Sequence, residues 1–107
     1  MADERFVFVV DARVRAGLED EFLRRYAALG ERVAQGLDGH VSHRLCRALD
    51  EPGRWLIVSE WETLEQSQAW DRAPEHRQLT GALRECWDDV RRAGFVVHAE
   101  TRHPARV

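Results

Sequence analysis

Two of the chain's four tryptophans, Trp61 and Trp70, have the position and the chemistry to hold a flat ligand. Trp61 ends a run of apolar and β-branched residues, and Trp70 lies in the short helix that we expect next. Aromatic side chains supply large contact areas and stack on planar rings. We therefore expect both to border a pocket for an aromatic molecule, with burial in a core as the alternative. For Trp55 and Trp87, core packing or a dimer contact is the simpler interpretation.

His76 is the candidate for acid–base chemistry, because it follows Trp70 closely and stands at the start of a predicted helix. A histidine with an ordinary pKa of about 6.5 exchanges protons at neutral pH, and the positive end of a helix favours its neutral, basic form. The alternative is a solvated histidine at a helix start. His43, on a predicted strand, is a second candidate to face the same pocket, although a surface histidine is the simpler interpretation.

Three more residues complete the expected pocket. Phe8 lies on one face of the first predicted strand, and Trp87 lies on the apolar side of the last predicted helix. Arg72 ends the helix that contains Trp70, where its guanidinium would pair with a phenolate or carboxylate of the ligand or simply stay solvated.

The sequence offers no signature of a nucleotide site, a zinc protease or a serine hydrolase, because it has no glycine-rich phosphate loop, no HExxH and no GxSxG. His40 and His43 are three positions apart on a predicted strand, which would point them to opposite faces and prevent joint metal binding. We expect neither a metal nor a cofactor. Cys46 and Cys86 lie far apart without CxxC partners, so we expect two small, buried, reduced thiols.

The composition describes a single globular domain over residues 1–107. Apolar residues make up 44% and charged residues 33%, which suits a folded chain. The net charge of −3, with interspersed signs, argues against nucleic acid as the main partner, because phosphate binding needs a basic patch. The charged N-terminus lacks the form of a signal peptide and no segment is long enough to span a membrane, so we expect a cytoplasmic protein.

Hydrophobic periodicity predicts the elements that must position these residues. Strands are expected over residues 6–14, 40–49, 55–61 and 95–99, and helices over 18–33, from 63 to about 72 and from 75 to about 91. Gly36 suits the end of the first helix, Pro52 and Gly53 suit a type II turn, and Thr63 with Gln66 forms a capping box. Residues from about 102 onward would form a loose tail.

The order β-α-β-β-α-β is the ferredoxin-like α+β arrangement, with a four-stranded antiparallel sheet. Two helical segments cover only one face of such a sheet. Yet residues 6–10 are apolar on both faces, and residues 55–58 repeat the pattern. An uncovered apolar face would be a large exposed patch, so we predict a two-fold homodimer packed sheet to sheet.

Ser-Glu-Trp-Glu at 59–62, followed by Trp70 and by Pro-Glu-His at 74–76, resembles the antibiotic biosynthesis monooxygenase family. The likeness covers nearly the whole chain, including the opening strand, the helix start Ala-Gly-Leu-Glu-Asp-Glu-Phe and the Pro-Gly hairpin. It implies a dimeric α/β-barrel. Members of the family often oxidise polycyclic phenols or anthrones to quinones with O2 and without a cofactor. Other members are similar to haem-degrading enzymes, quinol oxygenases, isomerases or cyclases.

The sequence departs from the patterns of this family at four positions. Its anthrone oxygenases carry an Asn and a Tyr where this chain has Ile57 and Ser67, so that only Trp61 of their set is kept. Its haem-degrading branch carries an Asn and a His where this chain has Val10 and Thr80. The resemblance therefore disfavours haem degradation.

One leading hypothesis and two rivals follow. The leading hypothesis is a cofactor-independent monooxygenase that oxidises an electron-rich aromatic to a quinone with O2, the substrate being an anthrone, phenol or hydroquinone such as a polyketide intermediate. His76 would help to ionise the substrate, and Trp61 and Trp70 would hold its ring. The rivals are a polyketide cyclase or isomerase, which only folds the substrate and moves protons, and a non-catalytic module that binds small molecules.

Overall fold

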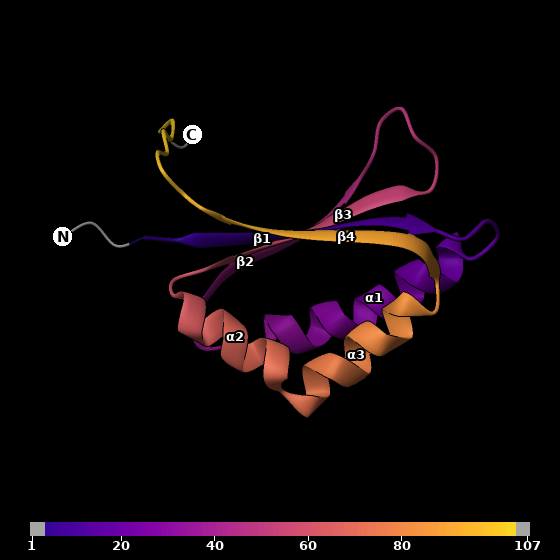
Figure 1. Cartoon of the computed structure of the whole chain (residues 1–107), viewed down its shortest axis with the longest axis horizontal. Coiled ribbons are helices and arrows are strands. Elements are labelled where there is room, and N and C mark those ends of the chain that lie inside the picture. Colours follow the sequence, from indigo (N-terminus) through magenta and orange to yellow (C-terminus); the bar gives the residue numbers. More distant parts are fainter. Residues whose placement is uncertain (1–3, 105–107) are drawn as a thin grey trace.

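The computed structural model describes residues 4–104, which form one layer of sheet against one layer of helices (Figure 1). All strand pairs are antiparallel and the spatial order is β2-β3-β1-β4. The strands are β1 Phe6–Val14, β2 His40–Arg47, β3 Arg54–Trp61 and β4 Trp87–Val96. The helices are α1 Glu19–Ala34, α2 Leu64–Arg72 and α3 Pro74–Arg84, and all three cover the same face of the sheet. The predicted ferredoxin-like fold is confirmed.

α1 forms where an apolar stripe follows a cluster of acidic residues that suits the positive helix end. Phe22 and Leu29 are buried, and the Glu21 carboxylate accepts a hydrogen bond from Arg25 one turn later, at 2.7 Å. The helix ends before Gly36, whose φ of +103° is a left-handed conformation that glycine adopts at little cost. The predicted C-terminal cap is confirmed.

Two local signals place the β2–β3 turn and the start of α2. In the turn, the N–H of Arg54 donates to the carbonyl of Glu51 at 3.2 Å and Gly53 has a φ of +85°, as a type II turn requires. Thr63 caps α2 by accepting the N–H of Gln66 at 3.1 Å. The side-chain oxygen of Gln66 accepts the Thr63 hydroxyl instead of reaching the backbone, so only half of the predicted capping box forms.

The predicted boundaries within residues 75–99 are wrong. α3 ends at Arg84 rather than near residue 91, and β4 starts at Trp87 rather than at residue 95. Trp87 and Val90 have a spacing that suits a helix, but the second edge of β1 needs a hydrogen-bonding neighbour, and β4 supplies it along the whole length of β1. Residues 97–104 form neither helix nor strand, and the last three positions of the expected tail, 105–107, lie outside the described part.

The core lies between the sheet and the helices. Phe22 is fully buried, with its ring centroid 5.7 Å from that of Trp55 and 6.4 Å from that of Trp87. Leu83 of α3 is fully buried as well. This cluster ties α1 and α3 to the sheet, and it confirms the packing expected of Trp55 and Trp87.

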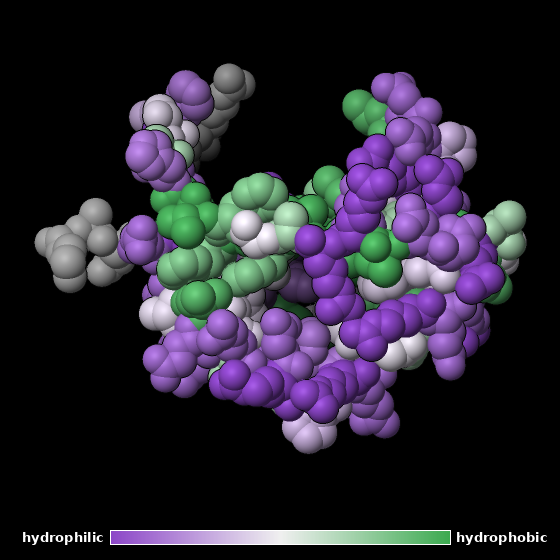
Figure 2. Space-filling view, viewed as in Figure 1, coloured by the Kyte–Doolittle hydropathy of each residue, from purple (hydrophilic) through white to green (hydrophobic). Residues whose placement is uncertain are grey.

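The other face of the sheet is not covered by any element of the described chain (Figure 1). Val7 and Val9 of β1, and Leu56 and Val58 of β3, point to this side, because alternate residues of a strand face opposite ways. Figure 2 shows apolar side chains gathered along this side of the molecule. The prediction of a sheet with two apolar faces is confirmed. Within residues 4–104, no helix is both long and apolar enough to cross a membrane.

Candidate ligand cavity

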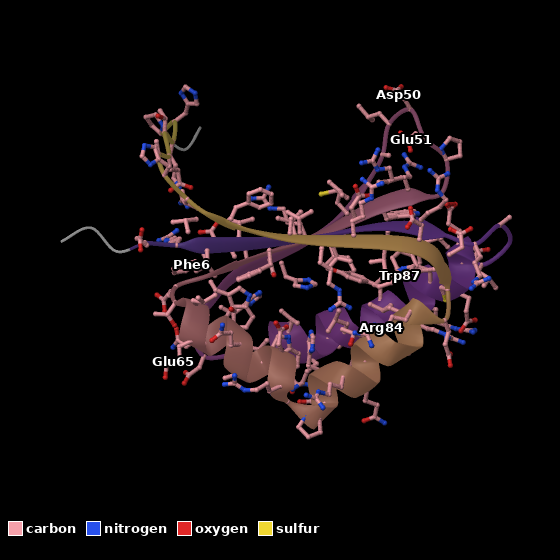
Figure 3. All side chains as sticks on the ribbon, viewed as in Figure 1. Phe6, Asp50, Glu51, Glu65, Arg84 and Trp87 are labelled. Carbon is pink, nitrogen blue, oxygen red and sulfur yellow. The ribbon has the colours of Figure 1, made fainter. Side chains whose placement is uncertain are left out.

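A cavity of about 310 Å³ lies between the sheet and the helices, and all seven elements contribute to its lining. Its volume lies at the lower end of the range of small-molecule sites. Figure 3 shows Phe6 and Trp87 on the helix side of the sheet, toward its opposite ends, and Figure 2 shows a hollow between β4 and the helix layer. The lining includes six of the seven predicted site residues: Phe8, His43, Trp61, Trp70, His76 and Trp87.

Trp61 forms a rigid wall of this cavity. Its side chain is only 3% exposed, and the His40 ring meets it edge-on with 4.9 Å between the ring centroids. The indole N–H donates to the Ser59 hydroxyl at 3.4 Å. Because that nitrogen is already engaged, Trp61 offers a ligand mainly the surface of its ring.

Trp70 is held in place by two neighbouring side chains. The Arg32 guanidinium lies 5.6 Å from its ring centroid, in the range of a cation–π contact, and also donates to Glu75 at 2.8 Å. The imidazole of His76 meets the same indole at 5.1 Å between ring centroids, in an edge-to-face arrangement. The predicted neighbours Trp70 and His76 are therefore in direct contact beside the cavity.

His76 combines a free nitrogen with a neutral ring. Its Nδ1 is buried and has no hydrogen-bond partner among the described residues, while its Nε2 lies 3.7 Å from a carboxylate oxygen of Asp71. Burial lowers the pKa of His76 below its ordinary value of 6.5, and the Asp71 carboxylate opposes this shift. The ring is thus neutral at pH 7, which is the form of a general base.

The expectation that His40 and His43 face opposite ways is wrong. A bulge lies between His40 and Ser42, where two steps along β2 match one step along β3. The extra residue, Val41, turns both imidazoles toward the cavity, with their ring centroids 5.8 Å apart. In a regular strand, residues three apart face opposite ways. The extra residue in the bulge cancels this alternation, so that positions 40 and 43 lie on the same face.

His43 has a partner behind the cavity wall. Its Nδ1 lies 2.7 Å from the hydroxyl oxygen of Tyr26 on α1, and the two rings are stacked with 5.7 Å between centroids. Burial lowers the pKa of His43 to about 4, with further contributions from His40 and His76, and burial raises the pKa of Tyr26 to about 12. Both groups are therefore neutral at pH 7. The sequence interpretation did not include Tyr26 among the site residues.

Arg72 does not line the cavity, so its predicted place in the pocket is wrong. It is exposed at the end of α2, on a part of the helix turned away from the cavity. The arginine in the lining is Arg92, which stands opposite Val10 in the β1–β4 register. The sequence interpretation missed Arg92 because it placed residue 91 at the end of a helix. Pairing with β1 puts Arg92 opposite Val10 and so on the helix side, because a register shift between Arg13 and Val14 breaks the alternation that starts at Trp87.

Residues 5–81 match the sequence model of the antibiotic biosynthesis monooxygenase family. The chain belongs to this family. The matched segment contains the cavity residues Trp61, Trp70 and His76, so the part that defines the family is also the part that forms most of the pocket.

Relatives of this family member occur in Streptomyces, and two of them show the extent of the similarity. The chain is 37% identical over 97 residues to a 42.8 kDa protein in the whiE locus of Streptomyces coelicolor, covering 91% of this chain and 24% of that protein. It is 32% identical over 97 residues to the polyketide synthase CurD of Streptomyces cyaneus, covering 91% of this chain and 25% of that protein. The chain thus spans about a quarter of the length of these relatives.

A solved structure with the same fold is SnoaB, a cofactor-independent oxygenase from Streptomyces nogalater. The two share a TM-score of 0.82 and 22% identity, over 95% of this chain and 100% of that one. This likeness supports the arrangement of strands and helices described above.

The four departures from the patterns of the monooxygenase family all lie in the cavity wall: Val10, Ile57, Ser67 and Thr80. The hydroxyls of Ser67 and Thr80 donate to carbonyls of their own helices, at 2.8 and 2.9 Å. Neither hydroxyl is therefore free for a ligand unless it breaks that bond. The polar groups that remain available come mainly from the histidines, which the sequence interpretation recognised only in part.

Metal-ligating residues do not gather in the described part of the chain, where no group of three or more His, Cys, Asp or Glu is placed to hold an ion. Cys46 and Cys86 are both free thiols. Cys86 is buried as expected, whereas Cys46 is only half-buried.

Proposed function

We propose that the chain is a cofactor-independent monooxygenase for a flat, electron-rich phenol or anthrone of polyketide type. The observation that carries this proposal is a neutral histidine, His76, with an unpaired nitrogen and an indole neighbour at the edge of an aromatic cavity. In the proposed reaction, Trp61 and Trp70 hold the ring system. His76 takes a proton from it, and the surrounding apolar wall excludes water.

The oxidation needs no reductant besides the substrate. The anion left by deprotonation passes one electron to O2, and the radical pair combines at the ring carbon to a peroxide anion. His76 returns its proton to this anion, and the resulting hydroperoxide loses water. In sum, a CH2 group and O2 give a ketone and H2O, so one oxygen atom enters the product and the other leaves as water. The task of the protein is to stabilise the anion and shelter the radical pair.

The comparisons support a role in polyketide chemistry. CurD is named a polyketide synthase and SnoaB a cofactor-independent oxygenase; the chain is similar in sequence to a quarter of the first and shares the fold of the second. The apolar Ile57 and the internally bonded Ser67 favour a second candidate, because they replace the polar pair of the anthrone oxygenases. That candidate is a cyclase or isomerase, in which His76 only moves protons within the substrate.

We also propose that the chain works as a homodimer whose uncovered sheet faces pack on each other. The apolar residues of this face need a partner, and a second copy supplies the same surface. Ion pairs flank the apolar area, with Arg54 contacting Asp11 at 2.6 Å and Arg5 contacting Glu60 at 3.0 Å. Such pairs suit the polar rim of an interface.

Oxygen uptake with 1,8-dihydroxyanthrone as the probe tests the proposed reaction. We expect one O2 consumed per anthraquinone formed, above the rate of spontaneous oxidation, and a loss of about 100-fold or more in His76→Ala. His98→Ala, on the exposed segment after β4, is the matched control and should keep the wild-type rate. Binding of the probe without O2 uptake would refute the oxygenase and leave the cyclase, the isomerase or a binding module.

A further inference from the structure

Tyr26 acts on the cavity through another residue, because it does not line the cavity itself. Its hydroxyl is 2.7 Å from Nδ1 of His43, and the near-parallel rings have an interplanar angle of 20°. Together the hydrogen bond and the stack fix both the position and the rotation of the imidazole. The remaining ring nitrogen, Nε2, has no hydrogen-bond partner among the described residues, and His43 lines the cavity.

The shared hydrogen belongs to the tyrosine hydroxyl. Both side chains are neutral at pH 7, so one hydrogen is available for the contact between them. Within residues 4–104, the Tyr26 hydroxyl has no other acceptor, and leaving a half-buried O–H unpaired would cost free energy. Donation to Nδ1 satisfies the hydroxyl. The imidazole must then carry its own hydrogen on Nε2, the ring nitrogen that is not engaged by Tyr26.

We propose that Tyr26 is a positioning residue that holds His43 as an Nε2–H donor, and that this donor binds a ring carbonyl or phenolate oxygen of the ligand. The ligand class rests on the proposed function, whereas the tautomer does not. A fixed donor binds an oxygen more strongly as negative charge develops on it. His76 thus removes the proton, and His43 stabilises the oxygen on which the charge collects.

Nitrogen-15 NMR of the histidine rings tests the tautomer directly. The wild-type protein at pH 7 should show His43 in the Nε2–H form, with Nδ1 shifted as an acceptor. In Tyr26→Phe, which keeps the ring but removes the hydroxyl, the Nδ1 resonance should lose that shift and a share of Nδ1–H should appear. Trp55→Phe is the matched control, because it alters the same core layer outside the cavity lining and should leave the His43 signals unchanged. An Nδ1–H tautomer in the wild-type protein would overturn the proposal.

A pair of probes tests the ligand oxygen. Anthraquinone-2-sulfonate and anthracene-2-sulfonate share ring size and charge, but only the first has carbonyl oxygens. We expect the wild-type protein to prefer the quinone and Tyr26→Phe to lose about threefold to tenfold of quinone affinity, with little change for the arene. His43→Leu should abolish the preference, and His43→Gln, whose amide supplies an N–H donor, should restore part of it. Equal affinities in the wild-type protein would refute the assigned ligand class.

These experiments separate this inference from the proposed function, because neither involves O2. A protein that prefers the quinone through His43 but consumes no O2 would refute the oxygenase and keep the donor. A protein that consumes O2 with His43 in the Nδ1–H form would keep the oxygenase and refute the donor.

Discussion

The imidazoles of His40 and His43 lie on the same side of the sheet, 5.8 Å apart, although three positions separate them on one strand. The bulge at Val41 makes this possible and brings two ionisable rings into one apolar cavity. With His76 on the facing helix, the cavity contains three histidines. Their burial disfavours the charged form of each, which affects both the stability of the fold and the chemistry of the site.

Acid should destabilise the fold within a window set by these histidines. Burial lowers the pKa of His40, His43 and His76, to about 4 for His43, whereas the unfolded chain binds the same protons near pH 6.5. Between those values the unfolded chain binds more protons than the folded chain, so the free energy of unfolding falls as the pH falls. The urea midpoint of the wild-type protein should decrease from pH 7 to 4.5. The decrease should be smaller in His43→Gln. In the control His98→Gln it should equal that of the wild-type protein. A level wild-type midpoint would contradict this account.

The pH dependence of the reaction should report the charges around His76. The base acts when neutral and burial lowers the pKa of His76, so the acidic limb of kcat/KM should have its midpoint below pH 6.5, the ordinary value for histidine. The Asp71 carboxylate raises the pKa of His76, and the cations Arg92 and Arg84 lower it. Asp71→Asn should therefore move the acidic limb to lower pH, and Arg92→Gln should move it to higher pH. If the acidic limb of kcat/KM moved in the same direction in both variants, His76 would be excluded as the titrating base.

A charge on the uncovered face should separate the dimer. Val58 points to this face from the middle of β3, so Val58→Arg would bury an unpaired cation between the two sheets. Light scattering should show a dimer for the wild-type protein and a monomer for this variant at micromolar concentration. Leu49→Arg is the control, because Leu49 is 95% exposed beside the β2–β3 turn. A wild-type chain that is monomeric at these concentrations would rule out the sheet-to-sheet dimer.

A methyl group at Gly94 should narrow the cavity. A Cβ at this position of β4 would lie 2.9 Å from Cε1 of Phe8, so the phenyl ring must move. We expect Gly94→Ala to weaken binding of anthraquinone-2-sulfonate and to cost about 1–3 kcal/mol of stability, as overpacking does. Gly81→Ala in α3 is the control, since its Cβ meets nothing within 4 Å and alanine favours a helix. Unchanged probe affinity in Gly94→Ala would show that Phe8 does not shape the occupied part of the cavity.

Local patterns were enough to predict most of the framework. The apolar stripe of α1, the left-handed Gly36 and the Pro-Gly turn depend on neighbouring residues, so they can be recognised without the rest of the fold. The same holds for the pairing of Trp70 with His76, because both lie on consecutive helices around one short break. The two-faced apolar strands likewise follow from alternation along the chain.

Tertiary structure decided what local patterns leave open. The spacing of Trp87 and Val90 favours a helix, and only pairing with the free edge of β1, through a register shift near Trp87, selects the strand that carries Arg92 into the cavity. The bulge in β2 depends on how that strand is paired with β3, since backbone hydrogen bonding between strands determines where an extra residue is accommodated. The contact of Tyr26 with His43 joins a helix to a strand, so it exists only once α1 packs on the sheet. The sequence by itself therefore determined the elements and the main aromatic residues, and packing determined which polar atoms face the ligand.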